Sequence, residues 1–264
     1  MVAQNECQTF VWINVEETVL NAKLVSITQP CADLIEQGIL TADDLIAYCA
    51  RVSNPSNQLN TETAPRLLAY CIRHGHWSVF ETASMTVEVE TSRAIAAQLL
   101  RHRSFTFQEF SQRYATASEF EPVELRKQDT KNRQASGDPM NRPALDAEVK
   151  LRLGDAQRTY DFLISCGVSK ETARMILPLA TRTRLYVTGN VRSWIHYFDQ
   201  RCSEHTQREH MTLAYQIARI FAQQFPNVWN AQQLREGGGI PPSLSFYRQV
   251  NKKPVVVNVK PNKL

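Results

Sequence analysis

Three arginines, one histidine, one carboxylate and several hydroxyls fall within fourteen consecutive residues, 101–114. Guanidinium groups make charge-assisted, often bidentate hydrogen bonds, so this cluster suits an anionic, planar, hydrogen-bonding ligand. Phe105, Phe107 and Phe110 alternate with the polar groups, which predicts that much of the segment is buried. Buried guanidiniums need anionic or carbonyl partners, and Glu109 alone cannot satisfy three of them. The cluster therefore predicts a ligand site rather than a solvated helix end.

Three polar residues further along the chain are separated by helical spacing. Tyr197, Arg201 and His205 are four residues apart, which predicts that they share one face of a helix. A purely structural helix would place Leu or Ile on such a stripe, so a polar cavity is predicted beside it. A plain surface stripe remains the alternative.

The spacing of the first cluster resembles the signature of the flavin-dependent thymidylate synthase family. R-H-R at 101–103 is followed by a hydroxyl residue, a polar–Glu pair at 108–109 and S-x-R-Y at 111–114. The resemblance extends over about residues 23–230. It includes H-G-H at 74–76, A-R-x-x-L-P at 173–178, N-x-R-S at 190–193 and R-x-x-x-x-x-Q at 201–207.

This resemblance implies a reaction and its participants. The family methylates dUMP to dTMP with 5,10-methylenetetrahydrofolate as one-carbon donor, FAD as redox cofactor and NADPH as reductant. It forms homotetramers whose active sites lie at subunit contacts. By the same resemblance Arg201 and Ser111 would be catalytic, with Arg201 stabilising the negative charge that develops on the uracil ring.

The binding residues are carried over position by position. The dUMP site would consist of Gln98, Glu109, Phe110, Ser111, Gln112, Arg113, Arg174 and Arg201. The FAD site would consist of Ser78, Glu81, Arg101, His102, Arg103, Ser104, Glu109, Asn190, Arg192, His196 and His205. His76 would stack on folate or flavin, and no metal site is predicted.

Four positions depart from the family pattern. Thr106 and Gln108 stand where Ser and Asn are usual, and Gln112 and His196 stand where Gly and Asn are common. None of these changes removes a charge. Gln112 does not have the conformational freedom of glycine, which leaves the backbone contacts to the nucleotide open.

The positions of the cysteines predict that they are reduced packing residues, and that none is a catalytic nucleophile. All six are scattered, and none forms a C-x-x-C pair. Flavin-independent thymidylate synthases use a cysteine within P-C-H-Q, whereas Pro30-Cys31 continues here with Ala-Asp. The sequence therefore predicts a reaction without covalent cysteine catalysis.

Two other classes of protein remain open. A metal hydrolase could use His74, His76, Cys202 and His205, because His and Cys at such spacings can ligate zinc. A nucleic-acid-binding module could use the interleaved Arg and Phe of 101–113. A net charge of only +4 weakens the second reading.

The elements that must position these residues follow from periodicity. Strands are predicted at 8–15, 23–28, 85–90 and 185–188, and a helix begins after Thr41 as N-cap. Further helices are predicted at 63–74, 92–102 with Ser92 as cap, 144–166, 170–176, 190–201 and 207–225. The fold class is α+β, with helices packed around a mixed or antiparallel sheet in a single domain.

The sequence also predicts the domain boundaries and the cellular location of the protein. Residues 1–236 are predicted to form the catalytic domain, with a mobile surface loop at about 126–142 and a tail of unknown role at 237–264. A chain of 264 residues with 43% hydrophobic residues can build its own core. It shows no apolar run of membrane-spanning length and no signal-like start, so a cytoplasmic location is expected.

Overall fold

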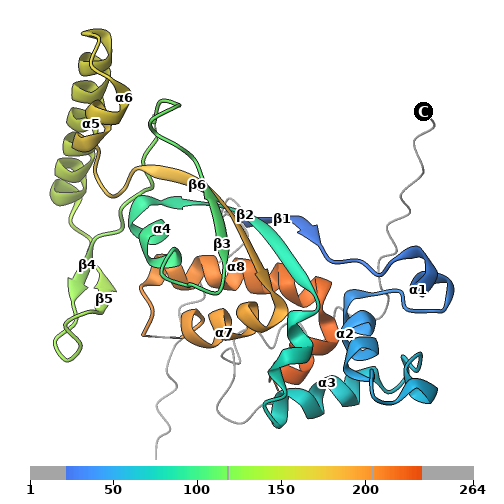
Figure 1. The fold of residues 1–264 in the computed structure, drawn as a ribbon. Coiled ribbons are helices and arrows are strands. Elements are labelled where there is room, and N and C mark those ends of the chain that lie inside the picture. Colours follow the sequence, from blue (N-terminus) through green and yellow to red (C-terminus); the bar gives the residue numbers. More distant parts are fainter. Residues whose placement is uncertain (1–21, 118, 204, 234–264) are drawn as a thin grey trace, which may run out of the picture.

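The computed structural model describes residues 22–117, 119–203 and 205–233, and its centre is an antiparallel sheet (Figure 1). Four strands follow one another in space in the order β1 (Ala22–Ile27), β2 (Ser84–Ser92), β6 (Arg182–Asn190) and β3 (Thr106–Glu109). β2 and β6 pair along their full lengths, from Ser84 opposite Asn190 to Ser92 opposite Arg182. The α+β class predicted from the sequence is confirmed.

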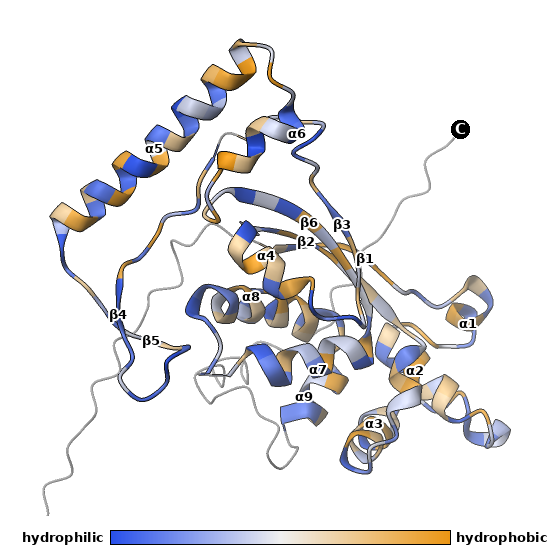
Figure 2. Cartoon of the chain, turned by 60° about the vertical axis from the view of Figure 1, so that its left-hand side comes forward, coloured by the Kyte–Doolittle hydropathy of each residue, from blue (hydrophilic) through white to orange (hydrophobic). Residues whose placement is uncertain are grey.

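One face of this sheet forms the core. Met85, Val87 and Val89 alternate with more exposed residues on β2, as the two-residue period of a strand requires. Helices α7 (Val191–Arg201) and α8 (Arg208–Gln224) lie side by side across this face (Figures 1 and 2). Trp194 of α7 is fully buried, and its indole Nε1 donates to the carbonyl oxygen of Met85 at 3.2 Å. This hydrogen bond fixes α7 against the sheet.

A smaller group of helices covers one end of the sheet. It consists of α1 (Ala32–Glu36), α2 (Ala42–Ala50), α3 (Ala64–Arg73), α9 (Pro226–Gln233) and the 3-10 turns η2 (Pro55–Asn57) and η3 (Trp77–Glu81). The buried Asp43 of α2 accepts from the backbone amides of Asn227, at 2.6 Å, and Val228, at 3.4 Å, in the first turn of α9. Burial raises the pKa of Asp43 to about 7.

Residues 143–176 project from the body, and we call them the arm (Figures 1 and 2). The arm comprises α5 (Pro143–Ser165), α6 (Lys170–Ala173) and the 3-10 turn η4 (Arg174–Ile176). Tyr160 is the one buried residue of α5. A short hairpin of β4 (Arg126–Gln128) and β5 (Ser136–Pro139) lies between the body and the arm.

Several predicted elements match the structure closely. Thr41 caps α2 with a reciprocal capping box, in which its Oγ1 accepts from the backbone of Asp44 and the Asp44 carboxylate accepts from Thr41. The helices predicted at 63–74, 144–166, 190–201 and 207–225 appear as α3, α5, α7 and α8. The strand predicted at 8–15 and the tail 237–264 lie outside the described residues.

Other predictions need correction. The helix α4 (Arg93–Leu99) ends three residues before the predicted boundary, and the Ser92 side chain makes no capping hydrogen bond. β6 is nine residues long, whereas only 185–188 was predicted, because its outer buried positions are taken by Thr183 and Gly189 rather than by apolar side chains. The predicted loop at 126–142 carries the β4–β5 hairpin, and α9 was not predicted. Within the described residues, no helix is both long and apolar enough to cross a membrane.

Candidate active site

Arg201 and His102 form the centre of the candidate site. Arg201 is the last residue of α7, and His102 lies in the turn after α4. The Nε of Arg201 donates to Nε2 of His102 at 2.8 Å, so the imidazole must carry its proton on Nδ1. Burial, reinforced by the charge of Arg201, lowers the pKa of His102 to about 4. The imidazole is therefore neutral at physiological pH.

Aromatic packing holds this turn in place. The His102 ring lies 5.0 Å from that of Tyr197, and the Phe105 ring lies 4.5 Å from that of Trp194. A Cβ on Gly189 would come within 2.2 Å of the Phe105 ring, so only glycine permits this approach. The turn that carries the R-H-R motif is thus pressed against β6 and α7.

Gln98 and His210 extend the same group toward α8. His210 is fully buried on α8, and its Nδ1 lies 3.1 Å from Oε1 of Gln98. Burial, with smaller contributions from the charges of Arg201 and His102, lowers the pKa of His210 to about 3. Tyr197 and His210 are buried and Gln98, His102 and Arg201 are half-buried; we call these five residues the buried cluster.

Glu109 has a partner that the sequence did not reveal. Arg93 donates from Nη1 to Oε1 of Glu109 at 2.8 Å and from Nη2 to the carbonyl oxygen of Phe110 at 3.1 Å. Thr183 donates to the same carboxylate oxygen at 2.9 Å. Among the described residues, none of the three arginines of 101–113 pairs with Glu109. The predicted burial of the segment holds for Phe105 but not for Phe110, which is 37% exposed.

The arginine of the S-x-R-Y motif faces the arm. Arg113 donates from Nη2 and Nε to Oε2 of Glu171, at 2.9 and 3.0 Å. Lys170 donates to the carbonyl oxygen of Tyr114 at 2.9 Å, and Arg174 Nε lies 3.4 Å from the carbonyl oxygen of Glu171. A pocket of about 390 Å³, which we call the arm pocket, is lined by Ser111, Arg113, Tyr114, Ser169, Lys170 and Glu171.

Four of the residues predicted to hold FAD lie at the start of α7 or contact it: Glu81, Ser104, Asn190 and Arg192. Asn190 caps this helix by accepting from the Ser193 backbone at 2.9 Å, and the Ser193 hydroxyl donates to the Ser104 carbonyl oxygen at 3.2 Å. Arg192 forms an ion pair with Glu81 of η3. Two segments far apart in the sequence, 77–81 and 190–193, are thereby brought together.

Four further residues that were predicted to bind the cofactor or folate are exposed. The side chains of Arg101 and Arg103 make no hydrogen bond or ion pair with any residue that the structure describes. His76 lies near Tyr70 and His74, with ring centroids 5.7 and 6.3 Å away. Ser78 lies on η3, one turn from Glu81. The available cations and rings are of the kinds that bind a nucleotide cofactor.

Two predictions about α7 are affected by where it ends. Because α7 ends at Arg201, His205 does not share its face with Tyr197, and the predicted stripe of three is wrong at its last member. His205 is exposed, and its backbone amide donates to Ser203 Oγ at 3.3 Å. His196 is exposed on α7, with Nε2 at 3.2 Å from Gln200 Nε2.

Some residues of the site were missed by the sequence analysis. Arg93, Glu171 and His210 contact predicted residues, and Lys170 lines the arm pocket together with Ser111 and Arg113. His210 could have been found, because it occupies the position three residues before Leu213 on the apolar stripe of α8. Gln112, which departs from the family pattern, is buried, and its Nε2 has no partner in the described part of the chain.

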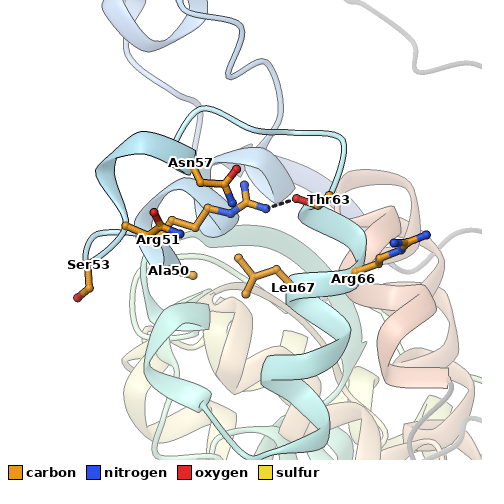
Figure 3. Close-up of a pocket in the computed structure, with 8 residues that line it drawn as sticks. Ala50, Arg51, Ser53, Asn57, Thr63, Arg66 and Leu67 are labelled. Atoms are coloured by element: carbon orange, nitrogen blue, oxygen red, sulfur yellow. Dashed lines mark hydrogen bonds between the residues drawn. The ribbon is translucent and has the colours of Figure 1, made fainter.

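A second pocket lies away from all of these residues. Its volume is about 450 Å³, and it lies between the end of α2 and the start of α3 (Figure 3). Arg51 donates there to Thr63 Oγ1 at 2.8 Å and also to the carbonyl oxygen of Asn60. Its guanidinium is thus satisfied by its own chain, and no predicted site residue lines this pocket.

The metal-hydrolase reading finds no centre in the structure. Within residues 22–117, 119–203 and 205–233, no three His, Cys, Asp or Glu side chains are arranged to hold a metal ion. Cys202 is buried, and burial raises the pKa of its thiol to about 12. A neutral thiol is a poor metal ligand.

Comparison with known proteins decides the family. Residues 34–227 match the sequence model of the family described as thymidylate synthase complementing protein. The chain belongs to this family. A probable flavin-dependent thymidylate synthase from Paramecium bursaria Chlorella virus 1 is 50% identical over 218 residues, which are 80% of this chain and 98% of the viral protein. A flavin-dependent thymidylate synthase from Synechocystis sp. is 47% identical over 217 residues, 79% of this chain and 97% of that protein.

A solved structure agrees with the fold. The UMP/dUMP methylase PolB from Streptomyces cacaoi, bound with 5-Br dUMP, superposes with a TM-score of 0.70 at 26% identity. The alignment covers 83% of this chain and 97% of that protein. Family membership confirms the resemblance seen in the sequence and, with it, the enzyme class, an FAD-dependent thymidylate synthase.

Proposed function

We propose that this chain methylates dUMP to dTMP with 5,10-methylenetetrahydrofolate as one-carbon donor, FAD as redox cofactor and NADPH as reductant. The observation that carries the proposal is the pairing of Arg201 with the neutral His102. This pairing fixes a cation in a partly buried cluster. Relatives that are flavin-dependent thymidylate synthases support this reaction, and a fixed cation in the cluster could stabilise the charge that the reaction develops.

Arg201 would act on the uracil ring. Because its Nε is bonded to His102, its orientation is set and its terminal Nη groups remain for a ligand. A fixed cation beside uracil stabilises the negative charge that develops as C5 attacks the one-carbon donor. Ser111, predicted as the second catalytic residue, lines the arm pocket rather than the buried cluster.

The arm pocket would hold the dUMP phosphate. Arg113 donates to the Glu171 carboxylate and Arg174 to the Glu171 carbonyl oxygen, and Lys170 adds a third cation. Guanidinium forks form bidentate, charge-assisted bonds to phosphate oxygens. The remaining nucleotide contacts would come from Gln98, Glu109, Phe110 and Gln112.

The FAD site would use the residues around the start of α7. FAD, when bound, supplies the redox chemistry of the reaction. Arg101 and Arg103 offer exposed cations suited to its diphosphate, and the Ser193 hydroxyl joins the start of α7, with Asn190 and Arg192, to the Ser104 carbonyl oxygen next to Arg103. Ser78, Glu81, His102, Ser104, Glu109, His196 and His205 complete the proposed set, and His76 would stack on flavin or folate.

Catalysis would proceed without a cysteine nucleophile. Cys71 and Cys202 are buried, and burial raises the pKa of both thiols. Cys31 and Cys166 are exposed but outside both the buried cluster and the arm pocket. A thiolate near uracil C5 is therefore not part of the proposal.

The assembly would be a homotetramer with shared sites. The arm carries exposed apolar side chains at Leu145, Leu151, Phe162 and Met175, and such surface favours contact with another copy. Residues 1–236 would form the catalytic unit and 237–264 a tail, and the family match over 34–227 supports this division. The cytoplasmic location stays a prediction.

The proposal is tested by product formation. Purified, FAD-loaded protein is incubated with dUMP, methylenetetrahydrofolate and NADPH, and dTMP is measured by mass spectrometry, with each component omitted in turn. We expect dTMP only in the complete mixture, and the same yield after all six cysteines are replaced by serine. Formation of dTMP without FAD, or its loss in the cysteine-free protein, would contradict the proposal.

A further inference from the structure

A line of hydrogen bonds connects the β4–β5 hairpin with the buried cluster. Arg126 forms an ion pair with Oε1 of Glu209, whose Oε2 accepts from Nε2 of Gln207 at 3.0 Å. Oε1 of Gln207 accepts from Nε2 of Gln98 at 2.6 Å. Oε1 of Gln98 in turn lies 3.1 Å from Nδ1 of His210. We call these five residues the relay.

From His210 to Glu209 the hydrogen bonds of the relay all run in one donor-to-acceptor direction, which Glu209 determines. Burial alone would raise the pKa of Glu209, but bonds from its own backbone amide, Arg126 and Gln207 hold it below its ordinary value. An ionised carboxylate only accepts hydrogen bonds, so Gln207 must turn its NH₂ group toward Glu209 and its oxygen toward Gln98.

The same logic continues along the relay. Gln98 must direct its NH₂ group to Gln207 and its carbonyl oxygen to His210. His210 must then donate from Nδ1, which leaves its buried Nε2 as an acceptor without a partner in the described residues. A buried unpaired nitrogen costs free energy, so a role in core stability alone does not explain the relay.

We infer that Glu209 is a positioning residue that fixes the amide orientation of Gln98 and thereby makes the site select uracil over cytosine. The inference rests on the proposed function, in which Gln98 contacts the dUMP base. Gln98 uses one N–H and one lone pair within the relay, so one of each remains for a ligand.

The chemistry of the two bases explains why orientation matters. Uracil presents the N3–H donor beside the O4 acceptor, whereas cytosine presents the N3 acceptor beside the N4 amino donor. An amide held in one orientation is complementary to only one of these edges. An amide free to flip would accept both, and discrimination would be lost.

The chain offers a matched pair of variants. Glu209→Gln replaces the fixed acceptor with an amide that can donate or accept, and the shape is retained. Glu124→Gln removes an equal charge from the same ion-pair group, because Oε2 of Glu124 contacts Arg126 at 2.9 Å and Arg208 at 3.3 Å. Glu124 has no bond to Gln207, so it is the control.

Dissociation constants for dUMP and dCMP are measured by calorimetry on FAD-loaded full-length protein. We expect the dCMP-to-dUMP ratio of dissociation constants to fall by roughly tenfold in Glu209→Gln, the value of about one hydrogen bond. The ratio should be unchanged in Glu124→Gln. Equal ratios in the wild type and Glu209→Gln, or an equal loss in Glu124→Gln, would overturn the inference.

A second measurement separates this inference from the proposed function. Nitrogen NMR of histidine-labelled protein without nucleotide, with His210→Gln to assign the signal, reports which nitrogen of His210 carries the proton. We expect Nδ1–H in the wild type, and Nε2–H would overturn the relay even if dUMP binds. If Nδ1–H is found but neither nucleotide binds, the proposed function fails, and the uracil selectivity fails with it.

Discussion

The buried cluster and the arm pocket handle their charges in opposite ways. In the buried cluster Arg201 faces a neutral histidine, and burial lowers the pKa of the guanidinium as well as that of His102. In the arm pocket Arg113 is paired with Glu171, and these side chains are 66% and 55% exposed. The first arrangement is fixed and carries uncompensated positive charge, whereas the second is screened and already neutralised.

This difference fits two kinds of task. Charge that develops during a reaction is best stabilised by a group that is already oriented and shielded from water. A charge that the ligand brings with it, such as a phosphate, can be bound by exposed arginines that exchange one anion for another. The comparison therefore assigns ring chemistry to the buried cluster and anchoring to the arm pocket.

The largest effect is expected from Arg201. Arg201→Ala removes the fixed cation and leaves His102 without its donor, so kcat should fall by about a hundred- to a thousandfold, as for loss of an oxyanion-stabilising donor. Steady-state kinetics of dTMP formation measures this. Lys23→Ala, at an exposed position of β1 away from both sites and from the arm, is the control and should leave kcat unchanged. A purely KM effect in Arg201→Ala would break the assignment of ring chemistry to this cluster.

The buried cluster should also respond to acid. With its pKa lowered to about 3, His210 stays neutral in the folded protein while the unfolded chain takes up a proton below about pH 6.5. The unfolding free energy should therefore fall between pH 7 and 4, on the order of 3 kcal/mol from this residue.

Comparison with His210→Gln isolates this contribution. Asp43, with its pKa raised to about 7, has the opposite sign over the same range, because its protonated form stabilises the folded state. Asp43 is present in both proteins, so its contribution cancels when their unfolding free energies are compared. Urea unfolding at several pH values should show that acid weakens the wild type more than the variant. Parallel pH profiles would contradict the account of a buried neutral histidine.

The arm pocket should affect binding rather than chemistry. Arg113→Ala removes a charge-assisted phosphate contact, which predicts roughly ten- to a hundredfold weaker dUMP binding with kcat preserved at saturation. Calorimetric titration with dUMP measures this, with Lys23→Ala again as control. Unchanged affinity would show that the phosphate is held elsewhere.

The smallest effect is expected from the partner of Arg113. Glu171→Gln removes an exposed ion pair worth less than about 1 kcal/mol, so dUMP should bind at most about fivefold more tightly. Added salt should reduce the difference, because it screens the pair in the wild type. Weaker binding in this variant would mean that Glu171 assists the nucleotide rather than competing with it.

The sequence predicted those parts of the site that depend on local spacing. The cap at Thr41 and the helix that ends at Arg201 follow from neighbouring residues, whereas Arg101 and His102 were predicted as the end of a helix and lie in the turn after it. The contacts of Arg93 with Glu109, and of Glu209 with Arg126, could not be predicted, because each depends on how distant segments meet. β6 was underestimated for a related reason, since the residues at its outer buried positions are not apolar, and their place in the core depends on the distant segments that they meet.

The most direct test of the proposed reaction is tritium release from dUMP labelled at C5. The purified protein is stripped of flavin, reloaded with FAD and supplied with methylenetetrahydrofolate and NADPH. We predict FAD-dependent release of tritium that matches dTMP formation and is abolished in Arg201→Ala. Folded, flavin-loaded protein that binds dUMP but releases no tritium would contradict substitution at C5 and, with it, the assignment of the buried cluster.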